Sequence, residues 1–331
     1  MIIDVHNHVV SGDRLPSYQS FLISGRGFHG KGHPNITEES VAQAKFSGKS
    51  HEDLLTEVGT DMAFISPRPF TMMHAQKPEK IVHYFIEASN DTIALAVKLS
   101  PTLMRGVAGL PQCSGQSPSV ALEELERCVK ELGFVGCVVN PDPGEGDGQT
   151  PGMGDEYWYP LYEKMVELDV PGIIHSAGCL NPRESFHNHF ITEEGIAVQS
   201  LMRSTVFDDF PNLKLIVCHG GGSVPYQIGR WRALDRFSDY EETFDQRLKK
   251  LYFDTALYNT ESLELLFKIV GPDNCLFGSE RPGAGSSTNP LTGRWFDDIK
   301  PLIDDIPWLS DEDRQKVYEG NARRLFTRFK D

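Results

Sequence analysis

Eight short runs of mostly apolar residues, rich in β-branched side chains, recur along this chain and alternate with longer segments of helical spacing. Such a run followed by a helical segment is the repeating unit of a parallel sheet covered by helices. Eight units in a chain of 331 residues favour the closed (β/α)₈ or TIM barrel of the α/β class over an open sheet. The predicted strands are Ile2–His8, Met62–Arg68, Gly106–Pro111, Phe134–Asn140, Gly172–Ser176, Leu213–His219, Leu251–Thr255 and Cys275–Glu280.

The segments between these runs agree with this prediction. Val120–Leu132 and Tyr157–Leu168 carry apolar residues every three or four positions, the spacing of a helix that packs on a sheet. The sequence shows no internal repeat, linker or low-complexity tract that would divide it. We therefore expect residues 1–331 to form a single barrel domain.

Charge and cysteine content exclude several classes of function. The chain has 47 acidic and 32 basic residues, a formal net charge of −15, so we expect neither a nucleic-acid nor a membrane partner. The sequence contains no apolar run of the roughly 20 residues that cross a bilayer, and it does not begin with a basic leader. Its six cysteines are widely spaced, as in reduced proteins, and we expect a cytoplasmic location.

Two long segments follow predicted strands. Residues 9–50, which are rich in glycine, come after the first strand, and residues 177–195 come after the fifth. Long loops at one rim of a barrel commonly form substrate walls or lids. We expect both segments to be rim loops of this kind.

Residues suited to metal binding and proton transfer gather at the ends of the predicted strands. Strand one ends in the His-x-His pair His6 and His8, strand five reaches His175, strand six His219 and strand eight Glu280. Active sites of such barrels lie at the C-terminal ends of the strands. His6 and His8 point the same way because side chains alternate along a strand. A His-x-His pair alone is more typical of satisfied polar residues, but the other strand ends favour a shared site.

We predict that His6, His8, His175 and Glu280 bind one divalent cation. Imidazole nitrogens and a carboxylate, with a position left open for water, are typical of catalytic rather than structural sites. Zn²⁺ suits this set of ligands, and Mn²⁺ is the alternative ion. A cation held in this way lowers the pKa of water from about 15.7 to near 7, or polarises a substrate carbonyl.

His219 precedes Gly220-Gly221-Gly222, where the chain is predicted to turn tightly and present the imidazole ring to the site. We predict that His219 acts as a general acid or base. The alternative is that it supports a ligand or binds substrate through a hydrogen bond. Glu280 is predicted both to bind the cation and to accept a proton from water, and the sequence does not separate these roles.

Four motifs together carry a resemblance to a known family. They are the strand-one His-x-His pair, Ile174-His175, Cys218-His219-Gly220-Gly221-Gly222 and Gly278-Ser279-Glu280. Over nearly its whole length the chain resembles the amidohydrolase superfamily, in the branch that contains decarboxylases and hydratases of aromatic degradation. That superfamily usually has aspartate at the end of strand eight, where this chain has Glu280.

Glutamate at this place, with several further motifs, is similar to the zinc-dependent 4-oxalomesaconate hydratases. The motifs are Ser66-Pro67-Arg68, Asn140-Pro141-Asp142-Pro143, Val224-Pro225-Tyr226, Thr292-Gly293 with Asp297-Asp298, and Tyr318–Arg324. The resemblance implies addition of water across a carbon–carbon double bond of an unsaturated keto acid with several carboxylates. It also implies His6, His8, His175 and Glu280 as metal ligands, Glu280 as the base for water, and His219 as the residue that protonates or polarises the substrate.

One position departs from the pattern of those hydratases. They carry a tyrosine after a histidine in the loop that follows strand five, whereas here Phe190 follows His189. The phenol that could donate a proton is therefore missing at this place. Either another acid takes its role or the chain acts on a related substrate.

A polycarboxylate substrate needs cationic anchors. Arg68 at the end of strand two is the first candidate, because a guanidinium group can bind a carboxylate through two parallel hydrogen bonds. Arg281 and Arg183 come next, with pairing to a rim carboxylate and exposure to solvent as their respective alternatives. Asn140 is predicted either to bind substrate or to hold the turn before Pro141.

The leading prediction is a metal-dependent hydratase of 4-oxalomesaconate or a close relative. The principal alternative is a metal-dependent, non-oxidative decarboxylase of a hydroxylated aromatic acid, which Phe190 favours and Glu280 disfavours. A hydrolase of a lactone or amide is third, because activated water also attacks carbonyl carbon. The fourth alternative is a barrel that binds a ligand without catalysis. By analogy with homologous barrels, we expect the protein to form a dimer.

Overall fold

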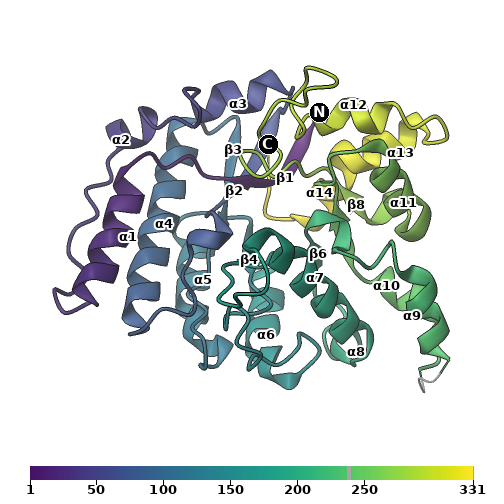
Figure 1. Cartoon of the computed structure of the whole chain (residues 1–331), viewed down its shortest axis with the longest axis horizontal. Coiled ribbons are helices and arrows are strands. Elements are labelled where there is room, and N and C mark those ends of the chain that lie inside the picture. Colours follow the sequence, from purple (N-terminus) through teal and green to yellow (C-terminus); the bar gives the residue numbers. More distant parts are fainter. Residues whose placement is uncertain (237–239, 331) are drawn as a thin grey trace.

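The computed structural model describes residues 1–236 and 240–330, and the eight predicted strands are confirmed. They form one parallel sheet in the order β1 to β8, and Figure 1 shows it surrounded by helices. Most strands are shorter than predicted at the C-terminal end or at both ends; β1 starts one residue later, and β3 both starts two residues earlier and ends three residues earlier. The strands are β1 Ile3–His8, β2 Met62–Ser66, β3 Met104–Ala108, β4 Gly136–Val139, β5 Gly172–Ile174, β6 Leu215–Val217, β7 Tyr252–Asp254 and β8 Cys275–Leu276.

The first and last strands meet and close the sheet into the predicted barrel. The backbone N–H of Val5 donates to the carbonyl of Phe277 at 3.0 Å, and that of Glu280 donates to the carbonyl of His6 at 2.7 Å. Asn7 and Arg281 also form a parallel bridge. Closure leaves the strands without an open edge and brings the ends of β1 and β8 together.

Helices cover the outside of the barrel, and an extensive apolar core lies between them and the strands. None of the helices in the described residues combines the length and apolarity that a membrane crossing requires. They are α1 Arg14–Gly25, α2 Glu38–Ala42, α3 His51–Glu57, α4 Lys80–Leu99, α5 Leu122–Lys130, α6 Tyr159–Leu168, α7 Phe186–Met202, α8 Val206–Asp209, α9 Ile228–Asp235, α10 Phe244–Leu248, α11 Thr260–Val270, α12 Ile299–Asp304, α13 Asp311–Gln315 and α14 Asn321–Leu325.

Residues 9–50 correct the prediction of a long rim loop, because they contain helices α1 and α2. The side chains of Leu15, Tyr18 and Leu22 lie on one face of α1 and pack in a core cluster with residues of α4. Their spacing of three and four positions is a helical signal that the neighbouring glycines obscured. The segment 177–195 is also shorter as a loop than predicted, since α7 begins at Phe186.

A second apolar cluster fills the inside of the barrel and is completed by the end of the chain. Phe326 and Phe329, which follow α14, pack in this cluster against Phe64 of β2, with ring centroids 4.7 and 5.2 Å from it. Gly136 of β4 leaves room there, because a Cβ at this position would lie 3.0 Å from the Phe326 ring. The C-terminal residues therefore form part of the barrel interior.

We expect Phe326→Ala to lower the free energy of unfolding by about 3–5 kcal/mol, because it opens a cavity in a fully buried cluster. Urea unfolding followed by circular dichroism measures this change. Phe28→Ala is the matched control, since 85% of the Phe28 side chain is exposed and its removal leaves no cavity. Equal effects of the two substitutions would contradict the role assigned to Phe326.

Candidate active site

The residues at the C-terminal ends of β1, β5 and β8 converge on one point. His6, His8, His175 and Glu280 each offer one ligand atom, and these atoms all lie within 4.8 Å of one another. All four side chains are buried. The structure thus brings together every residue that the sequence predicts as a metal ligand, although their strands are far apart in the chain.

Each histidine of this group is held by a hydrogen bond from its Nδ1 atom. His6 donates to the carboxylate of Asp254 at 2.6 Å, and His175 donates to the carbonyl of Ser176 at 2.6 Å. His8 lies 3.1 Å from the Ser66 hydroxyl, which itself donates to backbone carbonyls and accepts from the ring. Because Nδ1 carries the proton, each Nε2 keeps a free lone pair.

Two of these Nε2 atoms, those of His6 and His175, are buried without a hydrogen-bond partner among the described residues. A buried polar atom without a partner costs free energy, and such atoms in a native structure require an explanation. A divalent cation bound by the imidazoles would satisfy both. Hydrogen bonds from Nδ1 to a carboxylate or carbonyl are also what orients metal-binding histidines in proteins. The residues present therefore fit a cation.

The protonation states agree with metal binding. Burial, together with the neighbouring imidazoles, lowers the pKa of His8 and of His175 well below the ordinary value, so both rings are neutral. Burial alone would raise the pKa of Glu280, but the hydrogen bond and charge of His219 hold it well below its usual range. His8 and His175 thus offer neutral imidazoles and Glu280 an ionised carboxylate, the forms that bind cations.

His219 lies beside this cluster and connects it to a second carboxylate. Its Nδ1 atom donates to both oxygens of Glu194, at 2.9 and 3.0 Å, and its Nε2 atom lies 3.5 Å from Glu280 Oε1. Burial opposes the charged ring, yet the two carboxylates raise the pKa of His219 well above the ordinary value. His219 is therefore an imidazolium whose Nε2 proton faces Glu280.

Tyr258, which the sequence analysis missed, holds the other oxygen of the Glu280 carboxylate. Its hydroxyl donates to Glu280 Oε2. His219, Tyr258 and Glu280 all have positive φ values, of 48°, 55° and 61°. Such backbone conformations are costly for side chains other than glycine and gather at functional sites. The strained positions lie just beyond β6, β7 and β8, where the strand pairing has ended.

Asp254 and Glu194 were also missed, for different reasons. Asp254 is the last residue of β7, so the strand-end argument that selected His175 applies to it as well. Glu194 lies in the middle of α7, fully buried, and reaches His219 from outside the strands. No local pattern marks such a residue in the sequence.

Arg68 lies where the sequence analysis predicts it, at a pocket beside the cluster. The pocket has a volume of about 370 Å³ and is lined by the residues that follow β1 and β2, with Lys45 as a second cation. The guanidinium of Arg68 lies over the Phe46 ring, 5.0 Å from its centroid. Two positive side chains, Arg68 and Lys45, thus line a pocket next to the residues that follow His8.

Arg281 and Asn140 take the alternative roles that the sequence left open for them, and Arg183 lies apart from the pocket. The Arg281 side chain is fully buried and donates to the carbonyl of Leu54 and to the carboxylates of Asp297 and Glu57. Its prediction as a substrate anchor is therefore corrected, because its donors are used inside the protein. Asn140 is fully buried against His74 and the Asp142 carbonyl, which is the turn role. Arg183 is exposed in the loop before α7.

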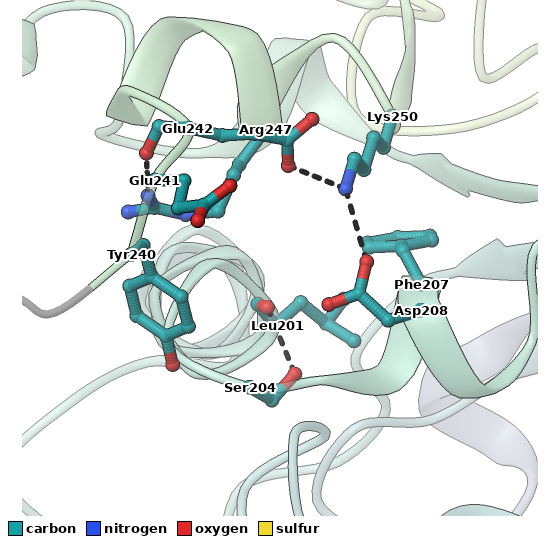
Figure 2. Close-up of a pocket in the computed structure, with 9 residues that line it drawn as sticks. All are labelled: Leu201, Ser204, Phe207, Asp208, Tyr240, Glu241, Glu242, Arg247 and Lys250. Carbon is teal, nitrogen blue, oxygen red and sulfur yellow. Dashed lines mark hydrogen bonds and ion pairs between the residues drawn. The ribbon is translucent and has the colours of Figure 1, made fainter.

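A different cavity, of about 390 Å³, lies away from this cluster and is shown in Figure 2. It is formed by the end of α7, by α8 and by the segment around α10, near the N-terminal ends of the strands. Lys250 pairs there with Asp208 and Glu242, so its charge is already balanced. This cavity holds none of the converging histidines, and we do not assign the chemistry to it.

Comparison with known proteins agrees with this geometry. The family model described as amidohydrolase matches residues 3–328. A 2-keto-4-carboxy-3-hexenedioate hydratase from Sphingobium sp. is 37% identical over 99% of this chain and 96% of the relative. A gamma-resorcylate decarboxylase from Polaromonas sp. is 31% identical over 72% of this chain and 74% of the relative. The solved structure of 4-oxalomesaconate hydratase from Rhodopseudomonas palustris superposes with a TM-score of 0.88, at 32% identity, and covers 99% and 96% of the two chains.

Proposed function

The chain belongs to the amidohydrolase family, and on that premise we propose that it is a metal-dependent hydro-lyase. Its substrate is an unsaturated keto acid with several carboxylates, of the 4-oxalomesaconate type, and the reaction adds water to the carbon–carbon double bond. The observation that carries the proposal is the convergence of His6, His8, His175 and Glu280 on one point, beside a charged His219. Full-length similarity to two hydratases supports the choice of reaction.

His6, His8, His175 and Glu280 would hold the divalent cation, and we propose Zn²⁺ as the ion. Three imidazole nitrogens and one carboxylate are a set of ligands that zinc accepts. A cation bound here supplies Lewis acidity, which makes water more acidic and polarises a substrate oxygen. The remaining steps belong to residues of the chain.

Glu280 acts as the base. Its carboxylate is ionised and takes a proton from water as the water oxygen forms a bond to one alkene carbon. The alkene electrons move toward the substrate carbonyl and leave negative charge shared between that oxygen and the second alkene carbon. The hydroxyl of Tyr258 binds Glu280 Oε2 and so orients the carboxylate.

His219 completes the addition. Its imidazolium gives the Nε2 proton to the second alkene carbon, which restores the carbonyl and finishes the product. The proton that Glu280 has taken then returns to His219 across the 3.5 Å that separate Oε1 from Nε2. Glu194 holds the ring in place throughout, and no net proton is gained or lost.

The pocket beside β1 and β2 would bind the negatively charged groups of the substrate. Lys45 and Arg68 line it and would bind carboxylates, and the fork of Arg68 suits two parallel hydrogen bonds. Phe70 and Phe85 supply apolar surface in the same pocket for the carbon skeleton. A chain that is acidic overall thus presents local positive charge where the proposed substrate needs it.

A decarboxylase of a hydroxylated aromatic acid is the second candidate. One observation favours it: Phe190 stacks on His219, with a centroid distance of 6.0 Å and an angle of 10° between rings, where the resembling hydratases carry a phenol. The similarity to gamma-resorcylate decarboxylase agrees with it. Tyr258, however, already places a phenol on Glu280, so the absence of one at position 190 does not decide against hydration.

The two candidates differ in their products. The test is to incubate Zn²⁺-loaded protein with 4-oxalomesaconate, 2-keto-4-carboxy-3-hexenedioate or gamma-resorcylate, each in ¹⁸O-labelled water. Hydration predicts loss of the conjugated absorbance and one labelled oxygen on product carbon by mass spectrometry, without release of carbon dioxide. Release of carbon dioxide from gamma-resorcylate, with neither keto acid hydrated, would reject the hydratase and support the decarboxylase.

A further inference from the structure

A second group of ligand-type side chains lies outside the catalytic cluster, at the start of α7. Asp142, His189 and Glu193 each offer one ligand atom, and these atoms lie within 4.8 Å of one another. Asp142 belongs to the segment after β4, while His189 and Glu193 are one helical turn apart on α7. They line a pocket of about 220 Å³ between these two segments.

The imidazole of His189 is buried and aimed into this group. Only 1% of its side chain is exposed, and its Nε2 atom has no hydrogen-bond partner among the described residues. The nearest carboxylate oxygen is Asp142 Oδ2, at 3.7 Å. This separation is too long for a hydrogen bond, but bonds of about 2.1 Å from both atoms to a shared ion span it. A buried nitrogen therefore faces a carboxylate across a space that fits a cation.

Glu184 fixes which nitrogen of His189 is available. The His189 Nδ1 atom lies 2.9 Å from Glu184 Oε1, and because an ionised carboxylate only accepts hydrogen bonds, Nδ1 carries the proton. Asn188 donates to the other oxygen of Glu184, Oε2, at 2.8 Å and prevents rotation of the carboxylate. A carboxylate that orients a histidine in this way is the usual outer partner of a metal ligand.

Asp142 is held just as firmly on the opposite side. Its Oδ1 and Oδ2 atoms accept hydrogen bonds from the backbone N–H groups of Gly144 and Gly146, at 3.1 and 2.6 Å. Oδ2 keeps a second lone pair for a cation, since a carboxylate oxygen has two. Both ligands are thus positioned before any ion binds, which lowers the entropy lost on binding.

We propose that Asp142, His189 and Glu193 form a second divalent-cation site, separate from the catalytic cluster and independent of the substrate. One imidazole nitrogen and two carboxylates suit Zn²⁺ or Mn²⁺, with the remaining positions filled by water. The bound ion joins the segment after β4 to the first two turns of α7. Phe190, the residue after His189 on α7, packs on His175 and His219. The ion would therefore hold in place the part of α7 that contacts the active site.

Metal content separates this site from the catalytic one. Protein stripped with a chelator is equilibrated with Zn²⁺, dialysed and measured by elemental analysis. We expect two ions per chain for the wild type, one for Glu193→Gln and one for His175→Ala, because each substitution removes a ligand of a different site. Glu163→Gln on α6, an exposed glutamate outside the pocket, makes the same chemical change and is expected to keep two ions.

Two further results complete the test. Zn²⁺ is expected to raise the melting temperature of His175→Ala but not of the double variant with Glu193→Gln, since an ion that binds only the folded chain stabilises it. Diffraction data at the zinc edge should show an anomalous peak between His189 Nε2 and Asp142 Oδ2 in the wild type. One ion per chain in the wild type with none in His175→Ala, or no peak at that position, would overturn the proposal whichever substrate the enzyme uses.

Discussion

Replacement of His175 by alanine is expected to remove the catalytic cation and, with it, measurable turnover. His175 is the ligand that β5 contributes, and its Nε2 atom has no other partner in the described part of the chain. Loss of an outer hydrogen bond to a metal ligand lowers metal affinity about 10–100-fold, and loss of the ligand itself costs more. Without the cation, the pKa of water returns toward about 15.7 and addition stops at neutral pH.

Elemental analysis and turnover are measured on the same preparation of His175→Ala. His29→Ala is the control, because His29 is an exposed histidine beyond α1 and lies outside both ligand groups. Circular dichroism verifies that both variants are folded. A His175→Ala protein that keeps full turnover and the full metal content of His29→Ala would contradict the ligand assignment and, with it, the proposed chemistry.

Replacement of His219 by asparagine is expected to lower kcat about 10²–10⁴-fold while the metal content stays unchanged, since general acid catalysis contributes about that much. Asparagine retains a polar side chain near Glu194 but has no titratable proton to give to carbon. The structure favours a proton donor over a metal ligand, because His219 lies beside the cluster and its two ring nitrogens already face the carboxylates of Glu194 and Glu280.

Comparison with His175→Ala makes the His219→Asn result decisive. Loss of kcat with retained metal supports a proton donor, whereas loss of metal would make His219 a ligand. A kcat within a few-fold of the wild type would remove His219 from the reaction. Incorporation of deuterium from D₂O at the second alkene carbon, measured by NMR, verifies that the remaining turnover still ends in protonation of that carbon.

The strand pattern predicted most of the active site because the position of a residue at a strand end determines whether it lies at the rim of the barrel. In a parallel barrel the C-terminal strand ends meet at one rim, so a polar residue that follows an apolar run is placed there by topology alone. His6, His175 and Glu280 were found in this way, and Asp254 obeys the same rule. The rule gives position along the strand but not the identity of the hydrogen-bond partner.

The rule failed where the chain leaves the strand conformation. Glu280 has a positive φ, so the extended strand has ended there, and the position of Arg281 next to Glu280 did not place its side chain at the substrate; it is buried against α3 instead. Helix contributions were also beyond reach, because Glu194 meets His219 only after α7 has packed on the barrel. Such contacts depend on tertiary packing, which a single sequence records only indirectly.

Closure of β1 against β8 has a consequence for how the protein is synthesised. His6 and His8 leave the ribosome long before Glu280, Phe326 and Phe329, because these residues lie near opposite ends of the barrel in sequence. The ligands from β1 cannot meet Glu280 until all eight strands have been synthesised, and contacts so distant in sequence form late in folding. Nascent chains should therefore capture no cation at the catalytic position, and catalytic competence should arise in a single final step.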